Sequence, residues 1–146
     1  MYQHTQYGWI IIAVAVPVVI FLAIASLAAK PASAAGMMVF TAICLAALLA
    51  LFGSLTVKAD NEGIRFHFGP GVIRRHIPYK DIVSVKRVRN HWYYGWGLRW
   101  YGRGWLYNVS GLDALEIALR NGKFIRVGTN QPDELLRFVS SRTQTG

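Results

Sequence analysis

Two long runs of hydrophobic residues occupy the N-terminal third of the chain. Residues 9–29 read WIIIAVAVPVVIFLAIASLAA and residues 37–57 read MMVFTAICLAALLALFGSLTV, and neither run contains a charged side chain. Each run has 21 residues, and about 20 apolar residues are enough for a helix to cross the hydrocarbon core of a bilayer. Because both runs are apolar on every helical face rather than along one stripe, they predict two transmembrane helices.

The connection between these runs, residues 30–36, is short enough to make the two helices antiparallel neighbours. Pro17 is compatible with a spanning helix, in which neighbouring groups can satisfy the carbonyl that proline frees, and it predicts a bend. Small side chains allow the helices to approach closely, and both runs contain them: Ala23, Ala25, Ser26, Ala42, Ala46, Ala47 and Ala50.

A cleaved secretory signal is the alternative interpretation of the first run. Ala32-Ser33-Ala34 has the small-x-small pattern of a cleavage site. However, the preceding MYQHTQY carries no Lys or Arg, and the apolar run is longer than the roughly 7–15 residues of a signal's hydrophobic region. The sequence therefore favours a retained helix.

After the second run the spacing of apolar residues changes to two, and turn residues recur every 8 to 12 positions. This pattern is typical of a small antiparallel sandwich or barrel. We expect strands at residues 55–60, 63–69, 72–79, 82–89, 97–101, 105–109, 114–119 and 123–128. Whether residues 97–109 form two regular strands is left open. The chain thus divides into a membrane hairpin, residues 1–57, and a β domain, residues 58–146, whose first strand begins near residue 55.

Two hairpins can be aligned by keeping apolar side chains on one face. Around Gly69–Val72, this criterion pairs Phe68 with Ile73, Phe66 with Arg75 and Ile64 with Ile77. The opposite face then carries four basic or titratable side chains, namely Arg65, His67, Arg74 and His76.

The second hairpin turns at Arg120-Asn121-Gly122. A three-residue loop with glycine in the left-handed conformation pairs Leu115 with Val127, Ile117 with Ile125 and Glu116 with Arg126. Downstream, TNQPDE (residues 129–134) combines a capping side chain, a proline and two acids, which predicts a helix start. The apolar residues that follow at helical spacing should close one end of the β structure: Leu135, Leu136, Phe138 and Val139.

The charge of the chain is strongly positive, with 16 Lys and Arg against 7 Asp and Glu. Lys58, Arg65, Arg74 and Arg75 follow the second run closely, whereas the connecting loop carries only Lys30. Basic residues favour the cytoplasmic side, so we expect a multi-pass protein of the cytoplasmic (inner) membrane with both termini in the cytoplasm. The aromatic residues Tyr2, Tyr7 and Trp9 are expected in the membrane-interface belt at the entry of the first helix.

The order of elements, together with IPYKDIVSV (residues 77–85) and GWGLRWYGRGWLYNVSGLDALEIALRNGKFIRVGTNQPDEL (residues 95–135), resembles small bacterial two-helix membrane proteins with a pleckstrin-homology-like (PH-like) domain. The resemblance implies a bent sandwich of seven strands, capped by a C-terminal helix and held at the cytoplasmic membrane. The pattern above predicts one strand more. The family supplies no catalytic residues, and its ligands are largely undefined.

The stretch HWYYGWGLRWYGRGWLY (residues 91–107) combines eight aromatic residues with two arginines and four glycines. The aromatics either fill the core, lie among lipid headgroups, or stack on single-stranded nucleic acid. In the lipid interpretation Trp92, Tyr93, Trp96 and Trp100 lie at headgroup level while arginines reach phosphates: Arg87, Arg89, Arg99 and Arg103. A basic side chain near an anionic leaflet gains about 1 kcal/mol, and tethering makes modest affinity sufficient, so lipid is favoured over nucleic acid.

Features of enzymes are lacking in the sequence. His4, His67, His76 and His91 show no metal-ligand spacing, Cys44 is the only cysteine, and no Gly-rich phosphate loop occurs. We therefore expect no catalytic residues, metal or cofactor.

The expected function is that of a membrane-anchored, non-enzymatic PH-like module that binds anionic lipid headgroups, a protein partner, or both. The alternative is a scaffold subunit that pairs with another membrane protein or with its own copy and docks a cytoplasmic segment by strand addition. Nucleic-acid binding is disfavoured. The candidate binding residues are Arg65, Arg74, Arg75, Arg87, Arg89, Trp92, Tyr93, Trp96, Arg99, Trp100 and Arg103.

Overall fold

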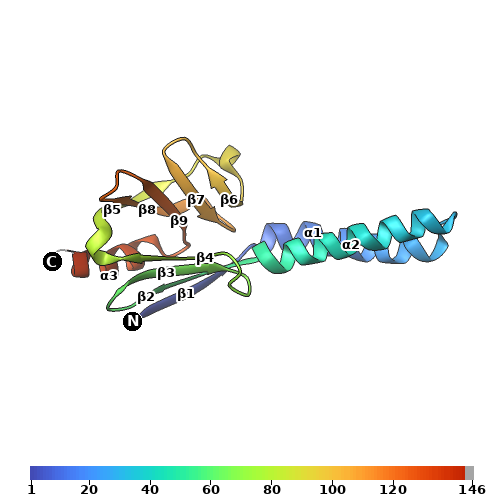
Figure 1. The fold of residues 1–146 in the computed structure, drawn as a ribbon, viewed down its shortest axis with the longest axis horizontal. Coiled ribbons are helices and arrows are strands. Elements are labelled where there is room, and N and C mark those ends of the chain that lie inside the picture. The colour runs from blue at the N-terminus through green and yellow to red at the C-terminus, as the bar shows by residue number, and fades with distance from the viewer. Residues whose placement is uncertain (144–146) are drawn as a thin grey trace.

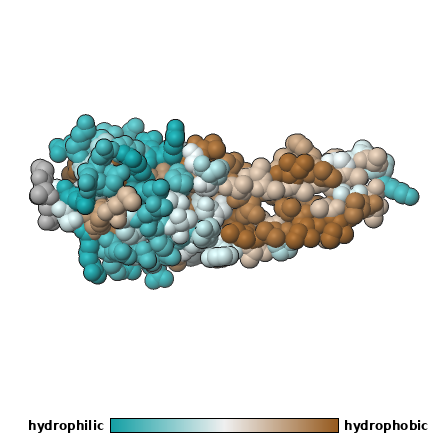
Figure 2. Space-filling view, turned by 90° about the horizontal axis from the view of Figure 1, so that it is seen from below, coloured by the Kyte–Doolittle hydropathy of each residue, from teal (hydrophilic) through white to brown (hydrophobic). Residues whose placement is uncertain are grey.

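A pair of long helices projects from one end of a β-rich domain in the computed structural model, which describes residues 1–143 (Figure 1). Helices α1 (Trp9–Ala28) and α2 (Ala32–Phe52) lie side by side and antiparallel. Both are long and apolar enough to cross a membrane by length and composition. Figure 2 shows hydrophobic surface concentrated on this helix pair and hydrophilic surface on the β domain, with surface of intermediate hydropathy between them.

The position of α2 differs from the expected 37–57 by five residues at each end. Its start lies directly after Pro31, because the small residues 32–36 continue the helix rather than forming a loop. It ends at Phe52, where the Gly53 N–H donates to the Leu49 carbonyl. The apolar residues 53–57 were included in the second hydrophobic run, although a strand was also expected from residue 55, and Ser54–Val57 belong to that strand.

The N-terminal residues form a strand that the sequence analysis did not predict. Strand β1 (Tyr2–Tyr7) pairs antiparallel with β2 (Ser54–Ala59), from Tyr2 opposite Ala59 to Tyr7 opposite Ser54. Residues 2–7 thus join the first sheet beside the strand that was expected to begin near residue 55. Tyr2 is buried against Phe138, so its predicted place in an aromatic belt is wrong.

The first sheet has the order β1-β2-β3-β4, and all its neighbours are antiparallel. Strand β3 covers Gly63–Phe68 and β4 covers Arg74–Pro78. The predicted register is confirmed, with Ile64 opposite Ile77 and Phe66 opposite Arg75.

The second sheet has the order β5-β8-β9-β7-β6. Its strands are β5 (Ile82–Arg89), β6 (Gly97–Trp100), β7 (Gly104–Asn108), β8 (Asp113–Leu119) and β9 (Phe124–Gly128). The β8–β9 register is as predicted, and Gly122 has a φ of 77°. Residues 97–109 do contain two regular strands. The expectation of a wholly antiparallel structure is wrong, because β7 and β9 are parallel.

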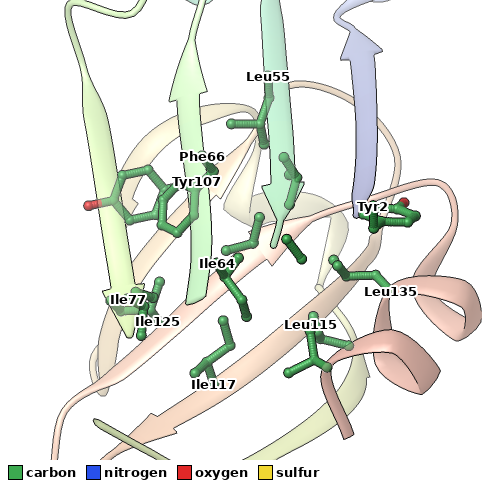
Figure 3. Packing of buried hydrophobic residues seen from close by; sticks show 14 of the residues in the cluster. Tyr2, Leu55, Ile64, Phe66, Ile77, Tyr107, Leu115, Ile117, Ile125 and Leu135 are labelled. Atoms are coloured by element: carbon green, nitrogen blue, oxygen red, sulfur yellow. The ribbon is translucent and has the colours of Figure 1, made fainter. Parts of the chain in front are cut away.

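The core lies between the two sheets and beneath α3 (Pro132–Thr143), which begins as predicted and buries Leu135 and Val139. Figure 3 shows Ile64 of the first sheet facing Ile117 and Leu115 of the second, with Leu135 closing one end. Short 3-10 turns connect the sheets at Tyr79–Asp81 (η1) and precede β6 at Trp92–Tyr94 (η2). The described part of the chain therefore forms two sheets of nine strands in total, a capping helix and the projecting helix pair.

Candidate functional site

The helix pair is a direct continuation of the β1–β2 hairpin. The Gly8 N–H donates to the Gly53 carbonyl at 2.8 Å, so the strand ladder extends to the base of both helices. A Cβ atom on Gly8 would lie 3.0 Å from the Val109 carbonyl oxygen, and one on Gly69 would overlap the Ala50 carbonyl oxygen. These contacts bring the β3–β4 turn and the end of β7 against the helices. We call residues 7–8, 53–54, 69–73, 96–98 and 109 the helix-facing end.

A groove of about 540 Å³ lies between the helix pair and residues 96–99. Its helix side is apolar and is lined by Ile11, Ala15, Leu45, Leu48, Leu49 and Phe52. Its domain side is formed by Trp96, Gly97, Leu98 and Arg99. Arg99 is the only charged side chain among the described residues that line this helix–β6 groove.

The predicted aromatic residues lie on different elements and make different contacts. Trp96 lines the groove, whereas Trp92 and Tyr93 lie on η2 and are exposed to solvent. Trp100 packs edge-on against Trp105 with ring centroids 5.7 Å apart, and it lies about 10 Å along β6 from Gly97. The core interpretation holds for Tyr107, but the four tryptophans between residues 92 and 105 are 36–81% exposed.

The predicted basic residues fall into two groups. Arg87 bonds Asp113 and Asp133, Arg65 bonds Asp60 and Glu62, and Arg103 stacks 4.6 Å from the centre of the Phe124 ring. By contrast, within residues 1–143 no carboxylate lies within 4 Å of the guanidinium of Arg74, Arg75, Arg89 or Arg99. The second group is free to bind an external anion.

Strand register sets how far each cation of the first sheet lies from the helices. The outer face carries His67 opposite Arg74 and Arg65 opposite His76, which confirms the predicted basic face. Thr56 pairs with His67 and Lys58 pairs with Arg65. At about 3.3 Å per residue, the Arg74 row lies about 7 Å beyond Ser54 and the Arg65 row about 13 Å beyond it. Arg74 is thus the cation of this face nearest the helices, whereas Arg65 is farther away and already paired.

A buried carboxylate holds the aromatic segment on the second sheet. Glu116 accepts from Arg126 Nε at 2.8 Å, Lys86 Nζ at 3.1 Å and the Tyr101 hydroxyl at 3.2 Å. Arg126 also donates to Asn90 Oδ1 at 3.1 Å and lies 4.2 Å from the centre of the Tyr101 ring. The predicted Glu116–Arg126 pair is confirmed, but its burial and its contacts with Asn90 and Tyr101 were not predicted. These two residues flank residues 91–100, so the cluster fixes both ends of that segment.

The pKa values of this cluster match a structural role. Burial alone would raise the pKa of Glu116, but the hydrogen bonds from Arg126, Lys86 and Tyr101 outweigh burial and hold the pKa below its usual value. Burial, and then the nearby Glu116 charge, raise the pKa of Tyr101 to about 12. At neutral pH the carboxylate is therefore ionised and the phenol is protonated, which is the pairing that the hydrogen bond requires.

Within residues 1–143 no group of three or more His, Cys, Asp or Glu side chains is placed to hold a metal ion. No protein-family model, curated protein or solved structure matches the chain.

Proposed function

We propose that this protein is a membrane-anchored, non-enzymatic module with a PH-like β domain, whose helix-facing end engages anionic phospholipid headgroups. In this proposal α1 and α2 span the cytoplasmic membrane and both termini lie in the cytoplasm. The observation that carries the proposal is the insertion of the helix pair between β1 and β2. Because the strand ladder runs directly into the helices, the helix-facing end would lie at the membrane surface.

The pairing of β1 supports two retained spans. Cleavage after Ala34 would remove β1 together with α1 and leave β2 with an unpaired edge. A segment that precedes a cleaved signal helix is lost with it and has no strand partner in the mature protein. Two spans inserted between β1 and β2 return the chain to the same side of the membrane, where the two strands can pair. The excess of Lys and Arg on the β domain over the single Lys30 near the helix tips favours a cytoplasmic domain.

The layout supports a PH-like architecture in part. Two sheets enclose one core, and the C-terminal helix packs against β5 and β8. Nine strands and a parallel β7–β9 pair depart from the seven strands that the resemblance implies. The proposal therefore keeps the capped sandwich and adds β1 and β6 as edge strands.

The placement of unpaired cations supports lipid contact. Arg99 lies at the groove and Arg74 about 7 Å beyond Ser54, which is within the roughly 8 Å over which charge acts at physiological ionic strength. Each should gain about 1 kcal/mol near an anionic leaflet. Arg65 lies farther away and is neutralised by Asp60 and Glu62, so we expect little from it.

Hydrogen exchange of the full-length chain in nanodiscs tests the proposal. We expect the amides of residues 91–100 to exchange more slowly in discs with phosphatidylglycerol than in phosphatidylcholine discs, and high salt to remove the difference. The double substitution Arg74→Gln, Arg99→Gln should abolish it, whereas Arg65→Gln, the matched control, should not. Equal exchange in both discs at low salt would refute headgroup binding.

A scaffold role is favoured by one separate observation. Strand β4 is an edge of the first sheet, and the groove between it and the second sheet is lined by Arg75, His76 and Arg120 together with one acid, Asp81. An acidic extended segment of a partner could pair with this edge. Recovery of one partner from membranes by the intact protein, and its loss in Arg75→Glu, His76→Glu, would support this role. No difference between the two proteins would argue against it.

A further inference from the structure

The apolar side of the helix–β6 groove runs along the helix axes. Leu45, Leu48, Leu49 and Phe52 follow α2 at i, i+3, i+4 and i+7 and therefore share one face. Ile11 and Ala15 are one turn apart on α1. At 1.5 Å per residue the lining extends about 10 Å from the base of α2 toward the helix tips. An apolar groove that follows the helix axes over this length suits part of an alkyl chain.

Ala15 provides part of the space in this groove. One turn away on the same face of α1, the groove is lined by the larger Ile11. Ala15 adds only a methyl group at its own position in the lining.

The mouth of the groove carries a positive charge. The Arg99 guanidinium lies beside Gly95, 3.6–3.8 Å from the point that a Cβ there would occupy. It has no carboxylate partner within residues 1–143, and the partly exposed Trp96 lies beside it in the lining. A guanidinium can bond two oxygens of a phosphate at once. The groove therefore pairs an apolar channel with an anion-binding end.

We infer that the helix–β6 groove is a binding site for a single phospholipid, with one acyl chain along α1 and α2 and the phosphate at Arg99. This inference rests on the proposed function, because the groove faces lipid only if the helices span the membrane. It goes further, because it assigns one retained molecule to a defined site rather than a general attraction between surfaces. Charge complementarity at Arg99 selects a phospholipid over an uncharged lipid.

Native mass spectrometry of the full-length protein, released from mild detergent, tests the inference. After equilibration with phosphatidylglycerol, the wild type should carry one phospholipid per chain. Ala15→Phe should lose it by filling the groove, whereas Ala13→Phe, on the exposed face of the same helix and outside the lining, should keep it. Retention by Ala15→Phe at the wild-type level, or equal loss from both variants, would overturn the site.

Arg99→Gln tests the polar end of the groove, because it removes the positive charge and keeps a polar side chain. We expect about tenfold weaker retention of phosphatidylglycerol, which corresponds to about 1.4 kcal/mol. An excess of inorganic phosphate should not displace the lipid, because free phosphate lacks the acyl chain. Displacement by phosphate would show that the apolar lining adds nothing to retention, and unchanged retention in Arg99→Gln would show that Arg99 does not hold the lipid phosphate.

The two proposals fail in different ways. Anionic-lipid protection in the nanodiscs without a retained lipid would overturn the groove site and leave headgroup binding standing. A retained lipid lost only in Ala15→Phe and Arg99→Gln, without any difference between the two nanodiscs, would support the groove site and refute the broader attraction.

Discussion

Replacement of Glu116 by alanine should strongly destabilise the β domain. The side chain of Glu116 is 2% exposed, and that of its partner Arg126 is 16% exposed. Removal of one member of a buried ion pair costs about 3–5 kcal/mol, because the other charge stays buried and unpaired. Arg126 would keep Asn90 and the Tyr101 ring, so we expect the lower end, about 3 kcal/mol. This is a large part of the roughly 5–15 kcal/mol that stabilises an ordinary domain.

The assay is urea unfolding of the full-length protein in detergent, followed by near-ultraviolet circular dichroism. The aromatic segment that the cluster holds should dominate this signal. Lys86→Ala is the matched control, because Lys86 bonds the same carboxylate but is 63% exposed and should cost less than about 1 kcal/mol. Equal losses from the two substitutions, or a Glu116→Ala protein as stable as the wild type, would refute the assignment of Glu116 as the centre of the cluster.

The same cluster sets a dependence on pH. Because the pKa of Glu116 is lower in the folded protein than in the unfolded chain, its stabilisation is present above the ordinary value of about 4.3. This stabilisation is lost as the pH falls through the folded-state pKa. The difference between wild type and Glu116→Ala should therefore shrink under acidic conditions. Tyr101 acts at the other end, since a pKa raised to about 12 stabilises the fold below pH 10 and less as the pH rises from there. A constant difference from pH 7 to about pH 3 would contradict this account.

Two further changes test how the helix pair is joined to the β domain. Gly69→Ala should lower the free energy of unfolding by about 2–4 kcal/mol, because Gly69 has a φ of 44° and a Cβ would overlap the Ala50 carbonyl. Gly71→Ala should lower it less in the same denaturation assay, since Gly71 has a φ of 96° but no atom lies closer than 3.9 Å to its Cβ position. Equal effects would show that the contact with α2 contributes nothing. Replacement of residues 9–52 by Asn-Gly, which favours a two-residue hairpin turn, should give a β domain that is monodisperse without detergent and folded by circular dichroism, since Gly8 and Gly53 are already bonded. A fragment of residues 58–146, which lacks β1 and most of β2, should not fold, and the reverse result would contradict the pairing of β1.

Alternating polarity made the two hairpins predictable. Ile64 and Phe66 are buried while Arg65 between them is exposed, so only one register keeps the apolar side chains together. Strand β1 lacks this contrast. Its inward side chains include His4 and Gln6, which lie opposite Val57 and Leu55, and a polar inner face gives no sign of a strand.

Other features depended on contacts between distant parts of the chain. The apolar character is continuous from α2 into β2, so hydropathy did not reveal that the helix ends at Phe52. The parallel β7–β9 pair joins strands separated by β8 in sequence, and no local pattern specifies that order.

The sequence predicted which residue types the candidate site contains but not how they are arranged in space. Aromatic and basic residues between positions 87 and 103 suggested a membrane-facing surface, yet Arg87 is held by Asp113 and Asp133. Trp100 is held by Trp105. Strand β6 pairs with β7, and β7 ends at Asn108, directly before Val109, whose carbonyl lies close to Gly8 at the base of the helices. This pairing places Trp96 and Arg99 in the lining of the groove beside the helices. This selection among similar residues required the tertiary structure.

The central claim is that lipid surrounds the helix pair and that the β domain lies on one side of the membrane. Cys44, the only cysteine, lies in α2 and is exposed on the isolated chain, so its reaction with a charged, membrane-impermeant maleimide measures this directly. In intact membranes Cys44 should stay unmodified from either side and react only after denaturation. In a Cys44→Ser background, Asn61→Cys should react from the cytoplasmic side and Lys30→Cys from the opposite side. Rapid labelling of Cys44 in intact membranes, or labelling of positions 61 and 30 from the same side, would contradict the account.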